Sequence, residues 1–125
     1  MASRTAPLIL VVEDDSAVLA SLNFMLEAEG FKVCAFDSVV RLLAADWPPE
    51  IACLVVDYGM PTMNGIDLLR HFRNRRMLVP AILITGHSDA MVRDRALAAG
   101  FVRIVNKPLR GNVLIEEIRQ VVAIT

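Results

Sequence analysis

The sequence predicts an α/β fold, a single domain in which helices cover both faces of a doubly wound, parallel five-stranded sheet. Five short apolar runs alternate with five segments whose apolar residues recur at helical spacing. Strands that alternate with helices form parallel sheets through right-handed crossovers. The 125 residues are 55% hydrophobic with a mean hydropathy of +0.51, as expected for strands buried on both faces. We therefore expect the flavodoxin-like strand order 2-1-3-4-5.

The strands are predicted from apolar runs that end at polar or turn residues. A polar tail, 1–6, precedes the domain, which we assign to residues 7–125. The third run, Ile51 to Val56, has six consecutive apolar residues and ends directly at Asp57. It is the best candidate for a central strand buried on both faces. The five predicted strands cover 8–12, 31–36, 51–56, 81–84 and 102–105.

The helices are predicted from apolar spacing and from residues that favour helix ends. Asp15, Asn64 and Asp89 stand where an N-cap is expected, and Asp37 or Ser38 can cap the second helix. Glycines after the first and fourth helices favour C-terminal turns. On the third helix the arginines at 70, 73, 75 and 76 are expected to point mainly outward. The predicted helices cover 16–29, the segment after 38 through 45, 66–75, 90–99 and a last one from about 112.

Composition excludes several classes of protein. The net charge of −1 gives no general attraction to nucleic acid or to an anionic membrane. The two cysteines, Cys34 and Cys53, lie in apolar runs and form no disulfide framework. We find no targeting segment, and no apolar run approaches the roughly 20 residues that span a bilayer. We expect a cytoplasmic protein that binds neither nucleic acid nor membrane directly.

Polar residues that follow the predicted strands should meet at one edge of the sheet. They are Glu13-Asp14, Asp57, Thr85 and Lys107. Two unit charges about 4 Å apart repel by about 4 kcal/mol at an effective dielectric of 20. The carboxylates therefore need shifted pKa values or a cation, and oxygen ligands with room for water suit Mg²⁺.

Such an edge is suited to phosphoryl transfer. Asp57 is central in the set and is the natural nucleophile, which would give an aspartyl phosphate. Lys107 adds a mobile positive charge that can pair with a phosphoryl oxygen, and Thr85 adds a hydroxyl donor. Neutralising the transferring group is most of what this reaction requires.

The motifs resemble the receiver domain of two-component response regulators over nearly the whole chain, with Asp-x-x-Met-Pro-x-Met-x-Gly as the most specific signal. The resemblance rests on Glu13-Asp14, Asp57 to Gly65, Ile84-Thr85-Gly86 and Lys107-Pro108. It implies that Asp57 accepts a phosphoryl group from a partner histidine kinase or phosphotransfer protein. It also implies that Thr85 and Lys107 sense that group and that the Lys107-Pro108 bond is cis.

The resemblance further implies a metal site and a signalling role. Glu13, Asp14, Asp57 and the backbone carbonyl of Gly59 would hold Mg²⁺. The protein would be a signalling phosphoacceptor rather than an enzyme, although it would assist its own phosphorylation and dephosphorylation. The resemblance also allows for a homodimer that forms when the protein is phosphorylated.

Three alternatives belong to other classes. A phosphohydrolase of the haloacid dehalogenase type needs a second Asp two positions after the nucleophile, where this chain has Gly59. A flavodoxin needs a phosphate cradle after the first strand, where the three acidic residues 13–15 would repel the flavin phosphate. A degenerate receiver that acts only as a binding module would be expected to lack Asp57, Thr85 or Lys107.

Two departures from the commonest receiver pattern affect the expected switch. Gly59 offers no side chain over the acceptor, and Ile104 stands where many relatives have a Tyr or Phe that swings inward. We therefore expect phosphorylation to move Gly86 to Met91 more than the surface around Ile104. Any partner or dimer contact would then form at Gly86 to Met91.

Overall fold

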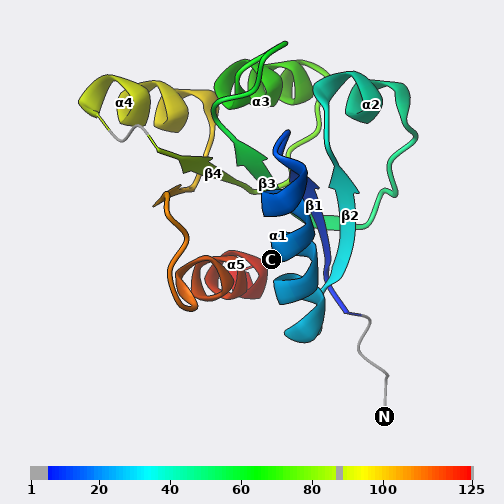
Figure 1. Ribbon diagram of the computed structural model, residues 1–125. Coiled ribbons are helices and arrows are strands. Elements are labelled where there is room, and N and C mark those ends of the chain that lie inside the picture. Colours follow the sequence, from blue (N-terminus) through cyan, green and yellow to red (C-terminus); the bar gives the residue numbers. More distant parts are fainter. Residues whose placement is uncertain (1–5, 87–88, 125) are drawn as a thin grey trace.

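A computed structural model of the chain, which describes residues 6–86 and 89–124, shows five parallel strands in the order β2-β1-β3-β4-β5. The predicted topology is therefore confirmed. Figure 1 follows the alternation of strand and helix along the chain. The strands are β1 (Leu8–Val12), β2 (Lys32–Phe36), β3 (Ile51–Asp57), β4 (Ala81–Thr85) and β5 (Arg103–Asn106).

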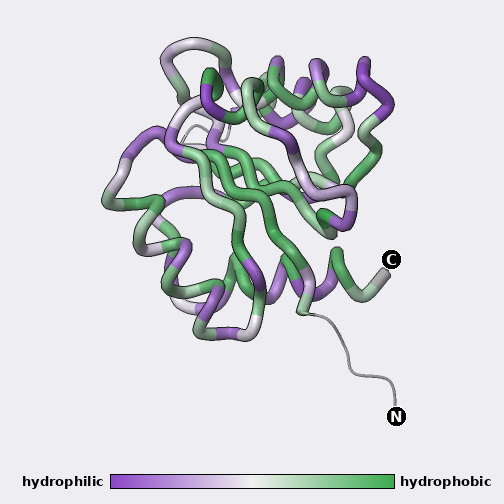
Figure 2. Tube along the Cα trace, turned by 90° about the vertical axis from the view of Figure 1, so that its right-hand side faces the viewer, coloured by the Kyte–Doolittle hydropathy of each residue, from purple (hydrophilic) through white to green (hydrophobic). Residues whose placement is uncertain are grey.

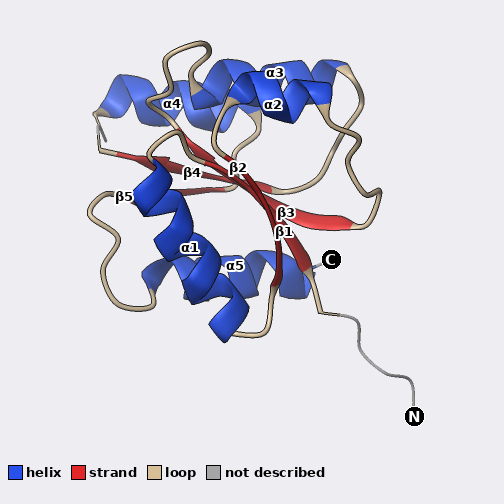
Figure 3. Ribbon diagram, turned by 45° about the vertical axis from the view of Figure 1, so that its right-hand side comes forward, coloured by secondary structure: helices blue, strands red, loops and turns tan. Residues whose placement is uncertain are grey.

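Five helices cover the two faces of the sheet. In Figures 1 and 3, α1 and α5 lie on one side, and α2, α3 and α4 lie on the other. This three-layer arrangement is what right-handed crossovers on both faces produce. The helices are α1 (Ser16–Ala28), α2 (Val39–Ala44), α3 (Gly65–Asn74), α4 (Ala90–Ala99) and α5 (Val113–Ile124).

The core is divided by the sheet into two apolar clusters. On β1, Ile9 and Val11 face α1 and α5, whereas Leu10 and Val12 face the other three helices. The central strand β3 alternates in the same way and is buried along nearly its whole length. Figure 2 shows this as a hydrophobic centre inside more polar helices and loops. Burial on both faces accounts for the high hydrophobic content.

The helix caps follow the sequence closely. The carboxylate of Asp15 accepts hydrogen bonds from the first turn of α1, and the side chains of Ser38, Asn64 and Asp89 do the same for α2, α3 and α4. Three strands, β3, β4 and β5, end one residue later than predicted. Asp57 pairs with Ile84 and is the last residue of β3, and Thr85 is the last residue of β4.

One predicted side-chain orientation is wrong. Arg73 was expected to point mainly outward on α3, but it is half-buried and its Nη1 donates to the backbone oxygen of Met77 at 2.6 Å. Burial lowers the pKa of Arg73. The cause is the turn that ends α3, which folds the chain back under the arginine. Arg70, Arg75 and Arg76 are exposed as predicted.

Candidate functional site: an acidic edge with one lysine

The carboxyl ends of β1, β3, β4 and β5 bring the predicted site residues together. Glu13 follows β1, and its backbone N–H donates to the oxygen of Phe36 on β2 at 3.1 Å. Asp57 ends β3, and the backbone N–H of Lys107, just after β5, donates to the oxygen of Thr85 at 2.9 Å. Backbone hydrogen bonds thus fix the relative positions of these residues independently of the contacts between their side chains.

Lys107 forms ion pairs with two carboxylates at this edge. Its Nζ donates to Oδ1 of Asp57 at 2.8 Å and to Oε1 of Glu13 at 3.2 Å. Glu13 is 2% exposed and Asp57 is 4% exposed, whereas the lysine side chain is one-third exposed. The lysine can therefore reach the two buried carboxylates while part of its stem stays in water.

Burial and neighbouring charges shift the pKa values of Glu13 and Lys107. Burial, followed by the negative charge of Asp57, raises the pKa of Glu13 to about 7, although Lys107 and the backbone N–H of Asp15 act in the opposite direction. Burial alone would lower the pKa of Lys107, but hydrogen bonds and attraction from Asp57 and Glu13 raise it overall. The lysine is therefore firmly protonated, and the edge still has more negative charge than one cation balances.

Three carboxylates of the edge could hold a metal ion. Ligand oxygens of Glu13, Asp14 and Asp57 lie within 4.8 Å of one another, and Asp14 is exposed to solvent. The donors are all oxygens, and one side is open to water, as Mg²⁺ requires. The chemistry of this donor set fits a hard divalent cation. The backbone carbonyl of Gly59 has no described contact here, and its role stays a prediction.

The loop after Asp57 is shaped by two glycines with different surroundings. Gly65 begins α3, and a Cβ added there would lie 2.7 Å from the backbone oxygen of Asp57 and 2.9 Å from Cδ1 of Leu83. Only glycine lets α3 approach the acceptor strand so closely. A Cβ on Gly59 would have nothing within 4 Å, so the mouth of the site is open there, as the sequence predicted.

The structure also shows where most of the remaining predicted residues lie. Thr85 is 1% exposed at the end of β4, next to the acidic edge. The Lys107-Pro108 bond is cis, as predicted. Ile104 is half-buried, pairs with Leu83 and packs against the core. The predicted switch segment includes residues 87 and 88, which lie outside the described residues.

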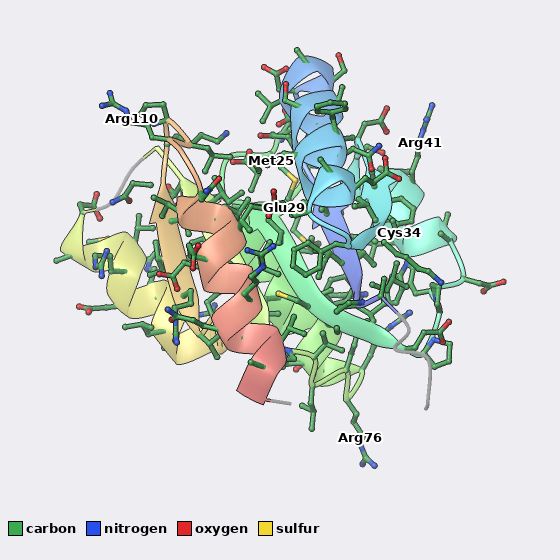
Figure 4. The ribbon with its side chains drawn as sticks, turned by 90° about the horizontal axis from the view of Figure 1, so that it is seen from below. Met25, Glu29, Cys34, Arg41, Arg76 and Arg110 are labelled. Carbon is green, nitrogen blue, oxygen red and sulfur yellow. The ribbon has the colours of Figure 1, made fainter. Side chains whose placement is uncertain are left out.

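An apolar groove beside the site was not predicted. It has a volume of about 650 Å³ and lies between α1 and the chain after β5, next to Lys107. Its walls include Ala17, Ser21 and Met25 of α1 and Pro108 and Leu109 after the lysine. Figure 4 shows the side chain of Met25 on α1. The sequence contained a signal for this groove. Apolar or small residues lie on several faces of α1, which is more apolar surface than packing against the core requires.

The fold and this edge define a receiver domain. The family model described as "Response regulator receiver domain" matches residues 9–119, so the chain belongs to the response regulator receiver family of two-component systems. Membership in this family excludes the phosphohydrolase and flavodoxin alternatives. Among the described residues, no helix is long and apolar enough to cross a membrane.

Known relatives agree with this assignment. The chain is 38% identical over 112 residues to the transcriptional regulatory protein FixJ of Rhizobium meliloti, covering 88% of this chain and 54% of that protein. It is 32% identical to nodulation protein W of Bradyrhizobium diazoefficiens, covering 93% and 51%. The chain thus spans about half the length of these curated relatives.

Solved structures show the same fold. The crystal structure of FixJ-N is 34% identical, has a TM-score of 0.83 and matches 96% of each chain. A CheY-like receiver domain from Methanospirillum hungatei is 27% identical, has a TM-score of 0.85 and matches 95% of each chain.

Proposed function

We propose that this domain accepts a phosphoryl group on Asp57 from a histidine kinase or phosphotransfer protein and thereby switches a signalling pathway. The observation that supports this best is the contact of Lys107 Nζ with both Asp57 and Glu13. The Asp57 carboxylate lies at the end of a buried strand, and one of its oxygens is paired with the ammonium group of Lys107. An open loop lies beside it. Such a carboxylate has the position and charge environment of a nucleophile.

The proposed reaction is an in-line displacement at phosphorus. One Asp57 oxygen forms the new O–P bond, the P–N bond to the donor imidazole breaks, and that electron pair stays on the imidazole nitrogen, which takes up a proton. Lys107 holds Asp57 in place and pairs with negative charge as the phosphoryl group arrives. Because the domain would consume one phosphoryl group and store it, we propose a signalling phosphoacceptor rather than an enzyme.

Mg²⁺ is the proposed cofactor. Glu13, Asp14 and Asp57 would hold it, together with the Gly59 carbonyl. When bound, it would supply positive charge that neutralises phosphoryl oxygens. The residues of the site favour binding of a cation, because their carboxylates carry more negative charge than Lys107 alone can balance. The pKa of Glu13 is raised mainly by burial and then by the negative charge of Asp57.

The partner would approach over α1. The apolar groove runs from Met25 toward Lys107, and the exposed face of α1 continues it with Ala20 and Phe24, which is 76% exposed. A helix of the donor protein could bury apolar side chains there while its histidine reaches Asp57.

A homodimer of phosphorylated chains would instead use Met91, Leu97 and Val102, three exposed apolar residues of α4 and the turn before β5.

Intact mass measurement tests the proposed acceptor. The purified protein is incubated with phosphoramidate as a small phosphodonor, with Mg²⁺ or with EDTA. We expect the mass of one phosphoryl group with Mg²⁺, and none in Asp57→Asn. Asp15→Asn is the matched control, because Asn keeps the α1 cap and lies outside the site. Asp14→Ala should need more Mg²⁺. Equal mass gain in Asp57→Asn would overturn the proposal.

A further inference from the structure

Strand β2 lies at one edge of the sheet, and its outer side is open. Within the described part of the chain β2 pairs only with β1, and Figure 1 shows it at the end of the row of strands. Val33 and Cys34 are half-buried and Ala35 is exposed. An edge strand presents a row of backbone N–H and C=O groups with which another strand can pair. The outer side of β2 is therefore an available interaction surface.

The hydrogen bonds to β1 identify which backbone groups of β2 face outward. The N–H of Lys32 donates to the oxygen of Pro7 at 2.9 Å, and the oxygen of Phe36 accepts a bond at 3.1 Å from the residue that follows β1. Successive residues of a strand turn their backbone groups to opposite sides. The even-numbered residues of β2 therefore bond to β1, and the N–H and C=O groups of Val33 and Ala35 point away from it.

Little on β2 prevents pairing with a further strand. Edge strands are commonly protected by charged side chains, prolines or bulges. β2 has no proline, pairs with β1 over five consecutive residues without a shift in register, and has one charged residue, Lys32, at its start. The other edge strand, β5, has four residues and begins with Arg103, whose Nε pairs with Glu117 at 2.8 Å. Of the two edges, β2 is better suited to accept a strand.

The free edge of β2 is complementary to itself. When two copies of β2 pair antiparallel over their full length, Val33 of each copy lies opposite Ala35 of the other. Both residues have outward-facing groups, so each of these pairs can exchange two hydrogen bonds. Lys32 then lies opposite Phe36, and no like charges face each other. Cys34 lies opposite the same residue of the second copy, on the two-fold axis that such an interface requires.

We propose that β2 pairs antiparallel with β2 of a second copy of this chain, about a two-fold axis at Cys34, so that the two sheets become continuous. The interface lies at the opposite edge of the sheet from β5 and does not depend on phosphorylation of Asp57. A strand of five residues buries little surface, so the dimer forms in concentrated protein and dissociates on dilution.

Amide hydrogen exchange, resolved by residue with NMR, tests the pairing. Exchange rates are compared in dilute and concentrated protein, in EDTA and without a phosphodonor, so that the result is independent of the proposed phosphorylation. The amides of Val33 and Ala35 should exchange about tenfold more slowly in concentrated protein. Those of Lys32, Cys34 and Phe36 should change less, because they already bond to β1. Unchanged rates at Val33 and Ala35, or slowing confined to α4, would overturn the proposal.

Variants at position 35 separate pairing from folding. Ala35→Pro removes an N–H that β1 does not use, so the ladder with β1 is kept while each copy loses one donor to the other. Sedimentation equilibrium should show association that is weaker by about tenfold. Ala35→Ser keeps the N–H and should associate like wild type. Wild-type protein that stays monomeric when concentrated, or equal association of the two variants, would refute the pairing.

Cys34 gives a third measurement in the unaltered strand. Facing residues that are not hydrogen-bonded across antiparallel strands have Cα atoms about 4.5 Å apart, within the range of about 4.4–6.8 Å for disulfides. The azo oxidant diamide should therefore convert two Cys34 thiols into one disulfide between copies, and it takes up the two electrons and two protons itself. Figure 4 shows the Cys34 side chain. Cys53 is buried, and burial raises its pKa to about 12, so it should stay reduced.

The control for this reaction is Cys34→Ser with Gln120→Cys, which moves the thiol to an exposed site on α5. Intact mass under non-reducing conditions measures the covalent dimer. We expect wild type to form it several-fold faster than the control in concentrated protein. Equal rates in the two proteins would show that the thiols meet by random collision, and would overturn the two-fold axis at Cys34.

Discussion

The Nζ atom of Lys107 lies 2.8 Å from Oδ1 of Asp57, across the carboxyl ends of two strands that are separated by β4. The same ammonium group also pairs with Glu13 at 3.2 Å. One lysine therefore stabilises two buried carboxylates, and removing any of these three charges should change the stability of the domain.

Removing Lys107 should destabilise the metal-free protein. Lys107→Met leaves two buried carboxylates without their cation, so the free energy of unfolding at pH 7 in EDTA should fall by about 1–3 kcal/mol, below the usual cost of breaking a buried pair because the lysine is partly exposed. Urea denaturation measures it. The control is Lys32→Met, since Lys32 is exposed on the edge strand β2 and should change stability little. Equal losses in both variants would show that Lys107 does not stabilise the two buried carboxylates.

Stability should depend on pH through Glu13. Its pKa is about 7 in the folded protein, above the ordinary value of 4.5, so the folded state binds more protons than the unfolded state between these values. The free energy of unfolding in EDTA should therefore fall, by up to about 3 kcal/mol from this residue, as pH rises from about 4.5 to 7.

Glu13→Gln isolates this contribution. Glutamine carries no charge, so the variant should gain stability over wild type at pH 7.5 and gain much less at pH 5. Denaturation curves of both proteins at the two pH values give the comparison. A difference that is the same at both pH values would show that Glu13 does not titrate in this range.

Alanine should be tolerated at Gly59 but not at Gly65. Gly65→Ala places a Cβ against the Asp57 backbone, and overpacking of this kind costs about 1–3 kcal/mol. Gly59→Ala meets open space and should stay within about 0.5 kcal/mol of wild type. Phosphorylation should slow in the first variant, because α3 and Asp57 must separate. Similar thermal shifts for the two variants would argue against the close approach of α3.

Replacing Arg76 should stabilise the domain. Arg76 has φ 61°, the left-handed conformation that the same turn gives to Gly30 after α1. Glycine adopts this conformation without steric cost, so Arg76→Gly should raise the free energy of unfolding by about 0.5–1 kcal/mol. Gly30→Ala should lower it. Thermal unfolding of both variants checks the signs, and a loss of stability in Arg76→Gly would refute the strain argument.

Periodicity and strand-end residues were sufficient to predict the topology and the convergence of Glu13, Asp57, Thr85 and Lys107. The reason is physical, since parallel strands all end at the same edge and a slip by one residue would expose the core. Caps such as Asn64 were predictable because the side chain acts on its own backbone three residues away.

Features that depend on contacts between distant segments could not be predicted. Arg73 looked like a surface charge because its partners, Met77 and Gly100, come together only when the turn after α3 and the end of α4 have folded. The groove along α1 needs the chain after Lys107 as its second wall. The raised pKa of Glu13 depends on burial, which one sequence does not specify.

Chemical mapping identifies the residue that carries the phosphoryl group, which we propose is Asp57. Borohydride reduces an aspartyl phosphate to homoserine, so the protein is phosphorylated, reduced and digested, and its peptides are sequenced by mass spectrometry. We expect homoserine at position 57 and unmodified aspartate at positions 14 and 15. Aspartate at 57 in fully phosphorylated protein, with the modification on another residue, would contradict it.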